Sequence, residues 1–257
     1  MIKSNLYKYD KYLDDNIDYI FNKEIIEYDI KSAGLNIIKR FKLLDENKIN
    51  YLSKLEKLHR DITIGKMQRK DKEFSKALIN GFKECRRMFF DANDIENDEV
   101  LSIKKDAIFL LRTVKNTQFE NIKFVNKNEY ISYIRLGKYE IYHNNGKIDV
   151  KGISDETLKL HEDGMLRFLN TFFIMMESEP NEKKIKKLLS EFAYEYKSML
   201  LPINFYREFN EKSLFRTNIG FESGLTSYLT NVNKECDYLD ISYNYLNVIT
   251  PLISIVI

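Results

Sequence analysis

The stretch Glu27-Tyr-Asp-Ile-Lys-Ser-Ala-Gly-Leu-Asn-Ile-Ile38 joins a short apolar strand to a helix and carries an acid close to the junction. Ile25 and Ile26 precede it as strand residues, and apolar side chains at helical spacing follow Gly34. An aspartate in this place, Asp29, either caps the helix or holds a metal ion. Features elsewhere in the chain decide between these two roles.

The composition of the 257-residue chain is that of a folded protein with one large domain or two small ones, because 44% of its residues are hydrophobic and 31% are charged. The formal net charge is only +2, so a basic surface requires segregation of the charges. The two cysteines, Cys85 and Cys236, lie far apart, and the three histidines are scattered. This spacing argues against a zinc site or a Cys/His nucleophile and favours a reducing compartment.

The two ends of the chain bear on where the protein is expected to work. The first ten residues are polar and do not resemble a signal peptide, and the apolar run at 248–257 is much shorter than the roughly 20 residues of a membrane-spanning helix. We therefore expect a cytoplasmic protein without membrane contact. The aromatic and apolar tail from Tyr238 to Ile257 is expected to form core structure or a surface for a protein partner or self-association.

Apolar periodicity predicts an α+β domain with a mainly antiparallel sheet between two helical parts. The predicted helices cover 32–47, 48–92 with a break near Ile62–Gly65, 155–176 and 182–200. Two apolar runs, 100–103 and 106–111, predict a hairpin with its turn at Lys104-Lys105. Further strands are predicted at 131–135, 139–142 and 147–151.

The segment from Gln68 to Phe90 predicts a helix with two different faces, at about 100° per residue. Its polar face carries a set of residues that we call the cation row: Arg69, Lys72, Lys76, Asn80, Lys83 and Arg87. Glu73 and Glu84 are expected beside the cation row without interrupting it. Such a row is either the solvated face of an amphipathic helix or a surface that binds phosphates.

Asp106 follows the predicted turn, at the start of an apolar strand. A single aspartate there is typical of a turn, but together with Asp29 it suggests two carboxylates on neighbouring strands. Two such carboxylates can hold two divalent cations about 3.5–4 Å apart, the arrangement used for phosphoryl transfer. The expected cofactor is Mg²⁺ or Mn²⁺, because magnesium prefers oxygen ligands.

In this order of motifs, the chain resembles family B DNA polymerases over about residues 25–175. Four motifs carry the resemblance: the first palm motif at Asp29 and Ser32, the fingers motif at Lys76 and Asn80, the hairpin acid at Asp106, and the duplex-contacting elements at Gly137–Tyr139 and Gly146–Ile153. The resemblance implies a palm-like sheet, a cationic fingers helix and a helical thumb-like part. The corresponding segments are 1–47 (lead-in and first palm motif), 48–92 (fingers), 93–154 (palm hairpin and sheet) and 155–257 (thumb-like region with the apolar tail).

The chain also departs from the family. Lys104 replaces the first acid of the hairpin, Phe82-Lys83 replaces the Tyr-Gly of the fingers motif, and only 106 − 29 = 77 residues separate the two acids. A proofreading exonuclease domain does not fit in this length. Gly34 stands where the family has a bulky tyrosine that excludes the ribose 2′-hydroxyl, which implies weak discrimination between the two sugars.

The activity implied by the resemblance is template-dependent nucleotidyl transfer, primase-like in its sugar discrimination, with nucleoside triphosphates and a nucleic acid as partners. Asp29 and Asp106 would hold the metal ions and serve catalysis. The other implied contacts are Arg69, Lys72, Lys76, Asn80 and Gly34 to the nucleotide, and Lys83, Arg87, Lys138, Tyr139 and Lys151 to the nucleic acid. Two alternatives stay open: Lys104 favours a palm-derived protein that binds nucleic acid without catalysis, and the apolar tail favours a structural or assembly protein.

Overall fold

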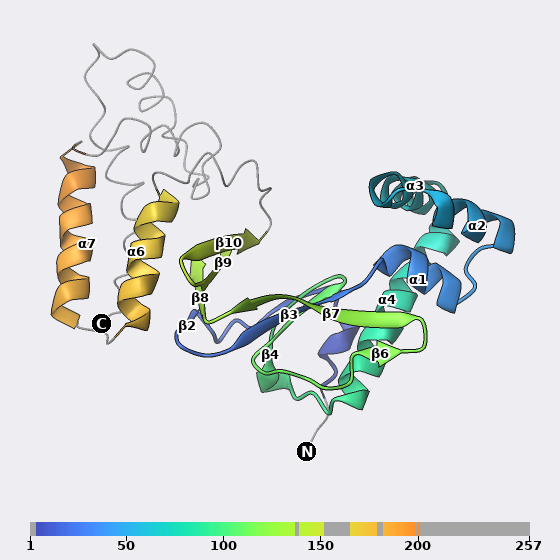
Figure 1. The fold of residues 1–257 in the computed structure, drawn as a ribbon, viewed down its shortest axis with the longest axis horizontal. Coiled ribbons are helices and arrows are strands. Elements are labelled where there is room, and N and C mark those ends of the chain that lie inside the picture. The colour runs from blue at the N-terminus through green and yellow to red at the C-terminus, as the bar shows by residue number, and fades with distance from the viewer. Residues whose placement is uncertain (1–3, 137–138, 152–164, 179–181, 199, 201–257) are drawn as a thin grey trace, which may run out of the picture. The chain divides into compact units, whose positions relative to one another are not determined.

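The computed structural model describes residues 4–136, 139–151, 165–178, 182–198 and 200 (Figure 1). The chain divides into two compact units, residues 1–17 with 24–129 and residues 18–23 with 130–257. The described parts contain antiparallel sheets and six α-helices, which confirms the predicted α+β class. The apolar tail and the start of the helix predicted at 155–176 lie outside the described residues, as does Lys138.

The first unit is built on a six-stranded sheet with the strand order β1-β4-β5-β3-β7-β6. The strands are β1 (Lys11–Leu13), β3 (Ile25–Ile30), β4 (Val100–Lys104), β5 (Ala107–Leu110), β6 (Gln118–Phe119) and β7 (Ile122–Tyr130). Adjacent residues of β3, such as Ile25 and Ile26, are both buried although they point to opposite faces of the sheet. The middle of this sheet is therefore covered on both sides.

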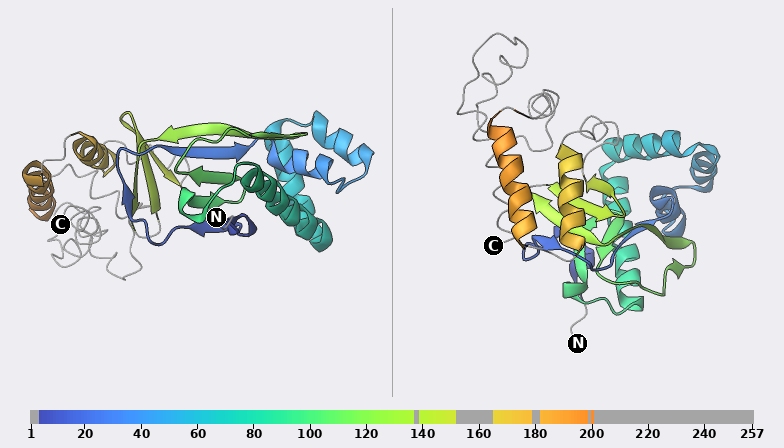
Figure 2. Two further views of the ribbon diagram at one scale, coloured as in Figure 1. Left: turned by 90° about the horizontal axis from the view of Figure 1, so that it is seen from below. Right: turned by 60° about the vertical axis from the view of Figure 1, so that its left-hand side comes forward.

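Four α-helices accompany this sheet: α1 (Ala33–Arg40), α2 (Glu46–Lys54), α3 (Lys57–Lys70) and α4 (Lys72–Ala92). The long helix α4 lies along one face of the sheet (Figure 2). Phe89 of α4 stacks on Phe124 of β7 with ring centroids 4.1 Å apart and also contacts the ring of Tyr28. Both α1 and α3 pack on α4, so α4 connects the sheet to the other helices. Two short 3₁₀ helices, Leu6–Lys8 and Asn97–Glu99, complete the unit.

The predicted helix at 32–47 is shorter than expected. Its chain leaves the helix after Arg40, and Lys42 adopts a left-handed conformation with φ of 49°. Asp45 then begins α2, because its side chain accepts a hydrogen bond from the backbone N–H of Lys48. A break that apolar spacing alone did not indicate is thus set by a left-handed residue and a capping aspartate.

The predicted break near Ile62–Gly65 is wrong, because α3 continues through Gly65. The helical region instead divides at residues 55–56 and at Asp71. The Asp71 carboxylate accepts hydrogen bonds from the backbone N–H groups of Glu73 and Phe74, which starts a new helix. A mid-helix glycine costs only about 1 kcal/mol relative to alanine, so Gly65 does not end α3.

The predicted hairpin is confirmed as β4 and β5, but its turn lies one residue later than expected. Lys104 pairs with Ala107, so the two turn residues are Lys105 and Asp106. Lys105 has a left-handed conformation with φ of 58°. Asp106 is therefore a residue of the turn and not the first residue of a strand.

The second unit contains an antiparallel sheet of order β10-β9-β8-β2. Its strands are β2 (Tyr19–Ile20), β8 (Ser132–Leu136), β9 (Tyr139–Asn144) and β10 (Lys147–Lys151), and its helices are α6 (Met165–Glu177) and α7 (Glu182–Lys197). The turn between β9 and β10 has positive φ at Asn145 and Gly146, as an Asn-Gly hairpin requires. Within the described residues, we find no helix with the length and apolar character needed to span a bilayer.

Candidate active site

A cavity of about 270 Å³ opens in the first unit, where the end of β3, the start of α1, the helices α3 and α4, and the β4–β5 turn come together. Its lining residues are Asp29, Ile30, Ser32, Ala33, Gly34, Lys57, Asp61, Ile64, Gln68, Leu78, Phe82, Lys105 and Asp106. The cavity thus joins residues from four segments of the first 106 positions. Both acids singled out in the sequence, Asp29 and Asp106, lie in its wall.

The two acids meet because of the strand register. Asp29 on β3 is the direct cross-strand partner of Ala107, the residue that follows Asp106. Burial raises the pKa of Asp106, and the negative charge of Asp29 raises it further. We call Asp29 and Asp106 the two-acid site.

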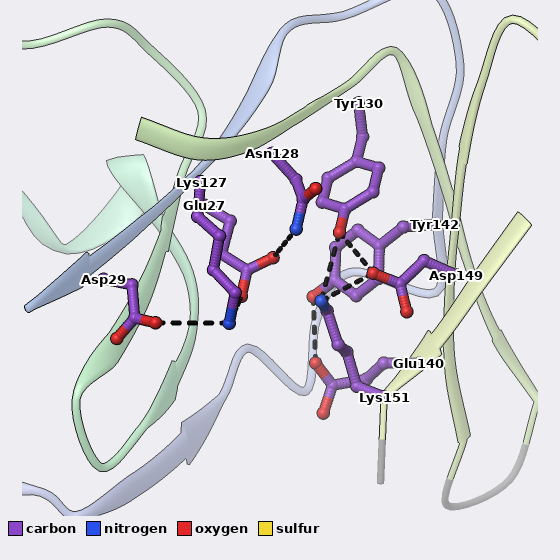
Figure 3. Close-up of polar contacts among 9 residues, drawn as sticks. All are labelled: Glu27, Asp29, Lys127, Asn128, Tyr130, Glu140, Tyr142, Asp149 and Lys151. Carbon is purple, nitrogen blue, oxygen red and sulfur yellow. Dashed lines mark hydrogen bonds and ion pairs between the residues drawn. The ribbon is translucent and has the colours of Figure 1, made fainter. Parts of the chain in front are cut away.

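Asp29 does not cap the helix that follows it. The N-cap residue of α1 is Ser32, which has a left-handed conformation and makes no capping hydrogen bond with its side chain. The Oδ2 atom of Asp29 instead lies 3.2 Å from Nζ of Lys127 on the neighbouring strand β7 (Figure 3). Its Oδ1 atom is buried and has no hydrogen-bond partner among the described residues.

Lys127 contacts a second acid as well. Its Nζ atom lies 3.4 Å from Oε1 of Glu27, a side chain that is only 3% exposed. The other oxygen of Glu27 accepts a hydrogen bond of 2.7 Å from the Asn128 amide. Burial alone lowers the pKa of Lys127, but the charges of Glu27 and Asp29 outweigh it, so that pKa lies above its ordinary value. Lys127 therefore carries its charge at neutral pH.

The residues of the two-acid site fit a divalent cation. An unsatisfied buried carboxylate oxygen on Asp29 and a neighbouring acid with a raised pKa are both relieved by a positive charge between them. Magnesium is commonly bound by one or two carboxylates together with substrate phosphates. Among the described residues, no group of three or more His, Cys, Asp or Glu side chains is arranged to hold a metal. A cation here would depend on Asp29, Asp106 and oxygens of a substrate.

The turn that carries Asp106 is held by a buried arginine. Arg86 of α4 is 0% exposed, and its guanidinium donates to the carbonyl of Lys105, to the carbonyl of Tyr7 and to Oδ1 of Asp10. The backbone N–H of Lys105 also donates to the carbonyl of Asp10, at 2.8 Å. We did not identify Arg86 from the sequence. The available signal was its place beside the apolar face of α4, where a charge needs buried acceptors.

The cation row does not form one continuous face along the cavity. Arg69 belongs to α3 and is separated by Asp71 from the rest of the row on α4. The side that α4 turns to the cavity carries Leu78 and Phe82. None of Arg69, Lys72, Lys76, Asn80, Lys83 and Arg87 is a lining residue.

The acids beside the cation row also pair with it, against expectation. Lys76 lies 3.0 Å from Glu73, and Arg87 forms ion pairs with both Glu84 and Asp91. The spacing of three or four residues within one helix makes these pairs possible. Part of the charge of the row is therefore compensated within α4.

Two cationic residues of α3 that we did not predict, Lys57 and Arg60, lie near the cavity, as does Lys105 of the β4–β5 turn. Lys57 lines the cavity, and Arg60 is 11% exposed with Nη2 3.5 Å from Oγ of the lining residue Ser32. The Nε atom of Arg60 is buried and has no hydrogen-bond partner among the described residues. Lys57, Arg60 and Ile64 share one helical face at spacings of three and four, which is the signal that could have identified them.

Of the residues predicted to contact a nucleic-acid duplex, Lys151 and Tyr139 lie in the described part of the second unit. Lys151 is only 14% exposed; its Nζ atom lies 2.7 Å from Asp149 and 3.0 Å from the hydroxyl of Tyr130 (Figure 3). The Tyr130 hydroxyl donates to the same carboxylate of Asp149. Tyr139 begins β9. The charge of Lys151 is thus compensated inside the sheet, which does not favour a role in binding phosphates.

A model of a known protein family matches this chain. The family described as Bacteriophage PBS1 gene 130 protein matches the chain over residues 1–257, so the chain belongs to this family. No curated protein matches it. The family is described as a phage gene product without a stated activity, so the resemblance to family B polymerases stays a prediction.

Proposed function

We propose that this member of the phage gene 130 family is a nucleotidyltransferase with a palm-like first unit, which extends a nucleic-acid strand on a template. The observation that supports this most is the convergence at one cavity of Asp29, on β3, and Asp106, in the turn that leads into the adjacent antiparallel strand β5. The order of the parts agrees with the proposal: a strand with an acid, then helices, then a hairpin with an acid.

In the proposed reaction, Asp29 and Asp106 hold Mg²⁺ or Mn²⁺ through their carboxylates. The bound cation would lower the pKa of the attacking hydroxyl and compensate charge on the phosphates. Lys57 and Arg60 of α3 attract the triphosphate, since ammonium and guanidinium groups donate charge-assisted hydrogen bonds to phosphate oxygens. We therefore propose that α3, and not the cation row, binds the triphosphate as the fingers helix does in family B polymerases.

Gly34 gives the proposal a substrate preference. It lines the cavity five residues after Asp29 and has no side chain that could exclude a 2′-hydroxyl. We expect ribonucleotides and deoxyribonucleotides to be used with similar efficiency, within about tenfold, because the position at which the resembled family carries a bulky tyrosine has no side chain here that could reject the hydroxyl. Lys83, Lys138 and Tyr139 stay proposed contacts to the nucleic acid.

The test uses the purified full chain, a primed template, Mg²⁺ or Mn²⁺ and both types of nucleotide, with primer length as the readout. Asp29→Asn and Asp106→Asn should each reduce extension at least about 10²–10³-fold, the usual cost of losing a group that stabilises the transition state electrostatically. Asp98→Asn is the matched control, because Asp98 is an exposed acid just before β4 and away from the cavity lining. No extension with either metal and either nucleotide would reject the proposal.

A second candidate is a palm-derived protein that binds nucleic acid without catalysis. Two observations favour it: Lys104 stands in place of the first hairpin acid, and Lys127 already forms an ion pair with Asp29. This candidate requires binding that weakens with salt, persists without metal and falls when Lys76 and Lys83 are neutralised. Calorimetric titration of Mg²⁺ in the presence of nucleotide separates the two candidates, because only the enzyme requires metal uptake.

A further inference from the structure

A lysine forms an ion pair with one acid of the two-acid site, Asp29. Lys127 projects from β7 toward β3, and its ammonium group lies between the carboxylates of Glu27 and Asp29 (Figure 3). The proposed function gives this lysine no role. It is the only ion-pair partner of Asp29 among the described residues.

The two acids that Lys127 contacts differ in how well they are satisfied. Glu27 is 3% exposed and accepts a hydrogen bond from the Asn128 amide in addition to its ion pair with Lys127. Asp29 has an unsatisfied Oδ1 in addition to the oxygen that faces Lys127. Of the two carboxylates, Asp29 is therefore the one with coordination capacity left for another cation.

Lys127 is also able to move. Its side chain is 51% exposed, and a lysine ammonium is a compact charge on a flexible four-carbon chain. If Asp29 is taken by another cation, Lys127 retains Glu27 as a partner at the same strand. The change from two acidic partners to one needs only rotation of side-chain bonds.

We propose that Lys127 is an internal counter-ion of Asp29, which competes with the divalent cation for this carboxylate and so sets the metal affinity of the two-acid site. This inference rests on the proposed function, because it takes Asp29 as a metal ligand. A positive charge close to a bound cation repels it, and in the absence of metal the same charge stabilises the carboxylate. Both effects weaken metal binding relative to a site without the lysine.

The competing explanation for Lys127 is direct binding of a substrate phosphate. The two explanations predict opposite results when the charge is removed. A counter-ion that competes with the metal gives tighter metal binding on removal, whereas a phosphate-binding lysine gives weaker substrate binding and unchanged metal affinity.

The experiment measures Mn²⁺ affinity by calorimetry or by electron paramagnetic resonance of the free ion, on the full chain without nucleotide. Lys127→Met should bind Mn²⁺ roughly tenfold more tightly than the wild type, because the repulsion is removed. Lys123→Met is the matched control, since Lys123 is exposed on the same strand and its side chain forms no ion pair among the described residues. Lys127→Arg keeps the charge and should stay within about threefold of the wild type.

Each outcome bears on a different statement. Tighter binding by Lys127→Met alone supports the inference, whereas equal or weaker binding overturns it and leaves the proposed metal site intact. If neither the wild type nor Lys127→Met binds Mn²⁺ alone, the titration is repeated with a non-hydrolysable nucleoside triphosphate present, and no Mn²⁺ uptake by the protein there overturns both. If Lys127→Met does not fold, Lys127→Gln carries the same comparison, because glutamine keeps hydrogen-bonding capacity toward Glu27 without the charge.

Discussion

Asp29 on β3 lies directly opposite Ala107 on β5, so that the turn residue Asp106 is brought next to it. This register places two carboxylates at one cavity although 77 positions separate them in the chain, as 106 − 29 gives. Two acids in such a place destabilise a fold unless a cation or a proton compensates them. Lys127 compensates Asp29, but the pKa of Asp106 is still raised, so the charged form of Asp106 is expected to cost stability in the protein without metal.

Replacing Asp106 by asparagine should raise the thermal stability at pH 7 while removing the proposed activity. Because the pKa of Asp106 is raised in the folded protein by burial and by Asp29, the folded state holds a proton more readily than the unfolded chain. Stability then falls as pH rises from the ordinary aspartate pKa, about 3.9, through the raised value, and stays reduced above it. Thermal unfolding of the wild type and Asp106→Asn from pH 3 to 8 checks this.

The pH dependence is the decisive part of that measurement. The advantage of Asp106→Asn should be largest at neutral pH and should shrink as pH approaches the ordinary aspartate pKa, where the wild type is protonated too. If Asp106→Asn instead unfolds at a lower temperature than the wild type, by the same amount at every pH, then neither burial nor the charge of Asp29 destabilises the Asp106 carboxylate. Excess Mg²⁺ should reduce the difference, because metal stabilises only the wild type.

Arg86→Met should destabilise the first unit by about 3 kcal/mol or more, since it leaves buried acceptors without a donor and Asp10 without its partner. Urea unfolding followed by circular dichroism measures this. The control is the adjacent Arg87→Met on the same helix, where two half-exposed ion pairs, to Glu84 and Asp91, contribute only about 0–1 kcal/mol each. Equal losses for both variants would contradict the role assigned to Arg86.

The local signals in the sequence were sufficient for the strand before Asp29 and for the β4–β5 hairpin. A run of apolar residues and a change of period mark both. The same signals placed the turn one residue too early, at Lys104-Lys105. Apolar periodicity does not indicate which of these two lysines is the last residue of the strand. Asp106 was therefore assigned to a strand although it is the second turn residue.

Other features of the site depend on contacts between distant segments, which sequence periodicity does not carry. The strand β7, which supplies Lys127, becomes polar after Val125 and shows no clear alternation. The start of α4 at Asp71 was hidden because the surrounding charged residues continue the helical pattern across it. Helical periodicity predicted that Arg69 belongs to the cation row on one helix. Because Asp71 caps a new helix, Arg69 instead lies on α3 and the rest of the row lies on α4.

Lys151→Met should destabilise the second unit by about 1–3 kcal/mol, because it removes the charged partner of a largely buried carboxylate. Although burial raises the pKa of Asp149, the hydrogen bonds from Lys151 and Tyr130 outweigh it, and this pKa lies below its ordinary value. Because the pKa of Asp149 is lower in the folded protein than in the unfolded chain, this carboxylate stabilises the fold above about pH 3.9. The stabilisation is lost as pH falls through the lowered pKa.

Acid unfolding provides the measurement for this network. The wild type should lose stability steeply below pH 4, whereas Asp149→Asn should be less stable than the wild type at pH 7 and less sensitive to acid. Lys183→Met is a suitable control, since Lys183 is exposed on α7 of the same unit and is not among the groups that shift the pKa of Asp149. An Asp149→Asn variant with the acid sensitivity of the wild type would refute the role of this carboxylate.

Replacement by alanine should change the free energy of unfolding in opposite directions at two glycines of neighbouring helices, Gly81 and Gly65. A Cβ atom on Gly81 of α4 would lie 2.4 Å from Cγ2 of the fully buried Ile37 and 3.2 Å from the ring of Phe41, so α1 would have to move. We expect Gly81→Ala to lower the free energy of unfolding by about 1–2 kcal/mol, because overpacking outweighs the gain in helix propensity. On Gly65 of α3 a Cβ atom meets nothing within 4 Å, so Gly65→Ala should raise it by about 0.5–1 kcal/mol. Urea unfolding of both variants tests whether α1, the helix that follows Asp29, is seated on α4 as described; a stabilising Gly81→Ala would mean that it is not.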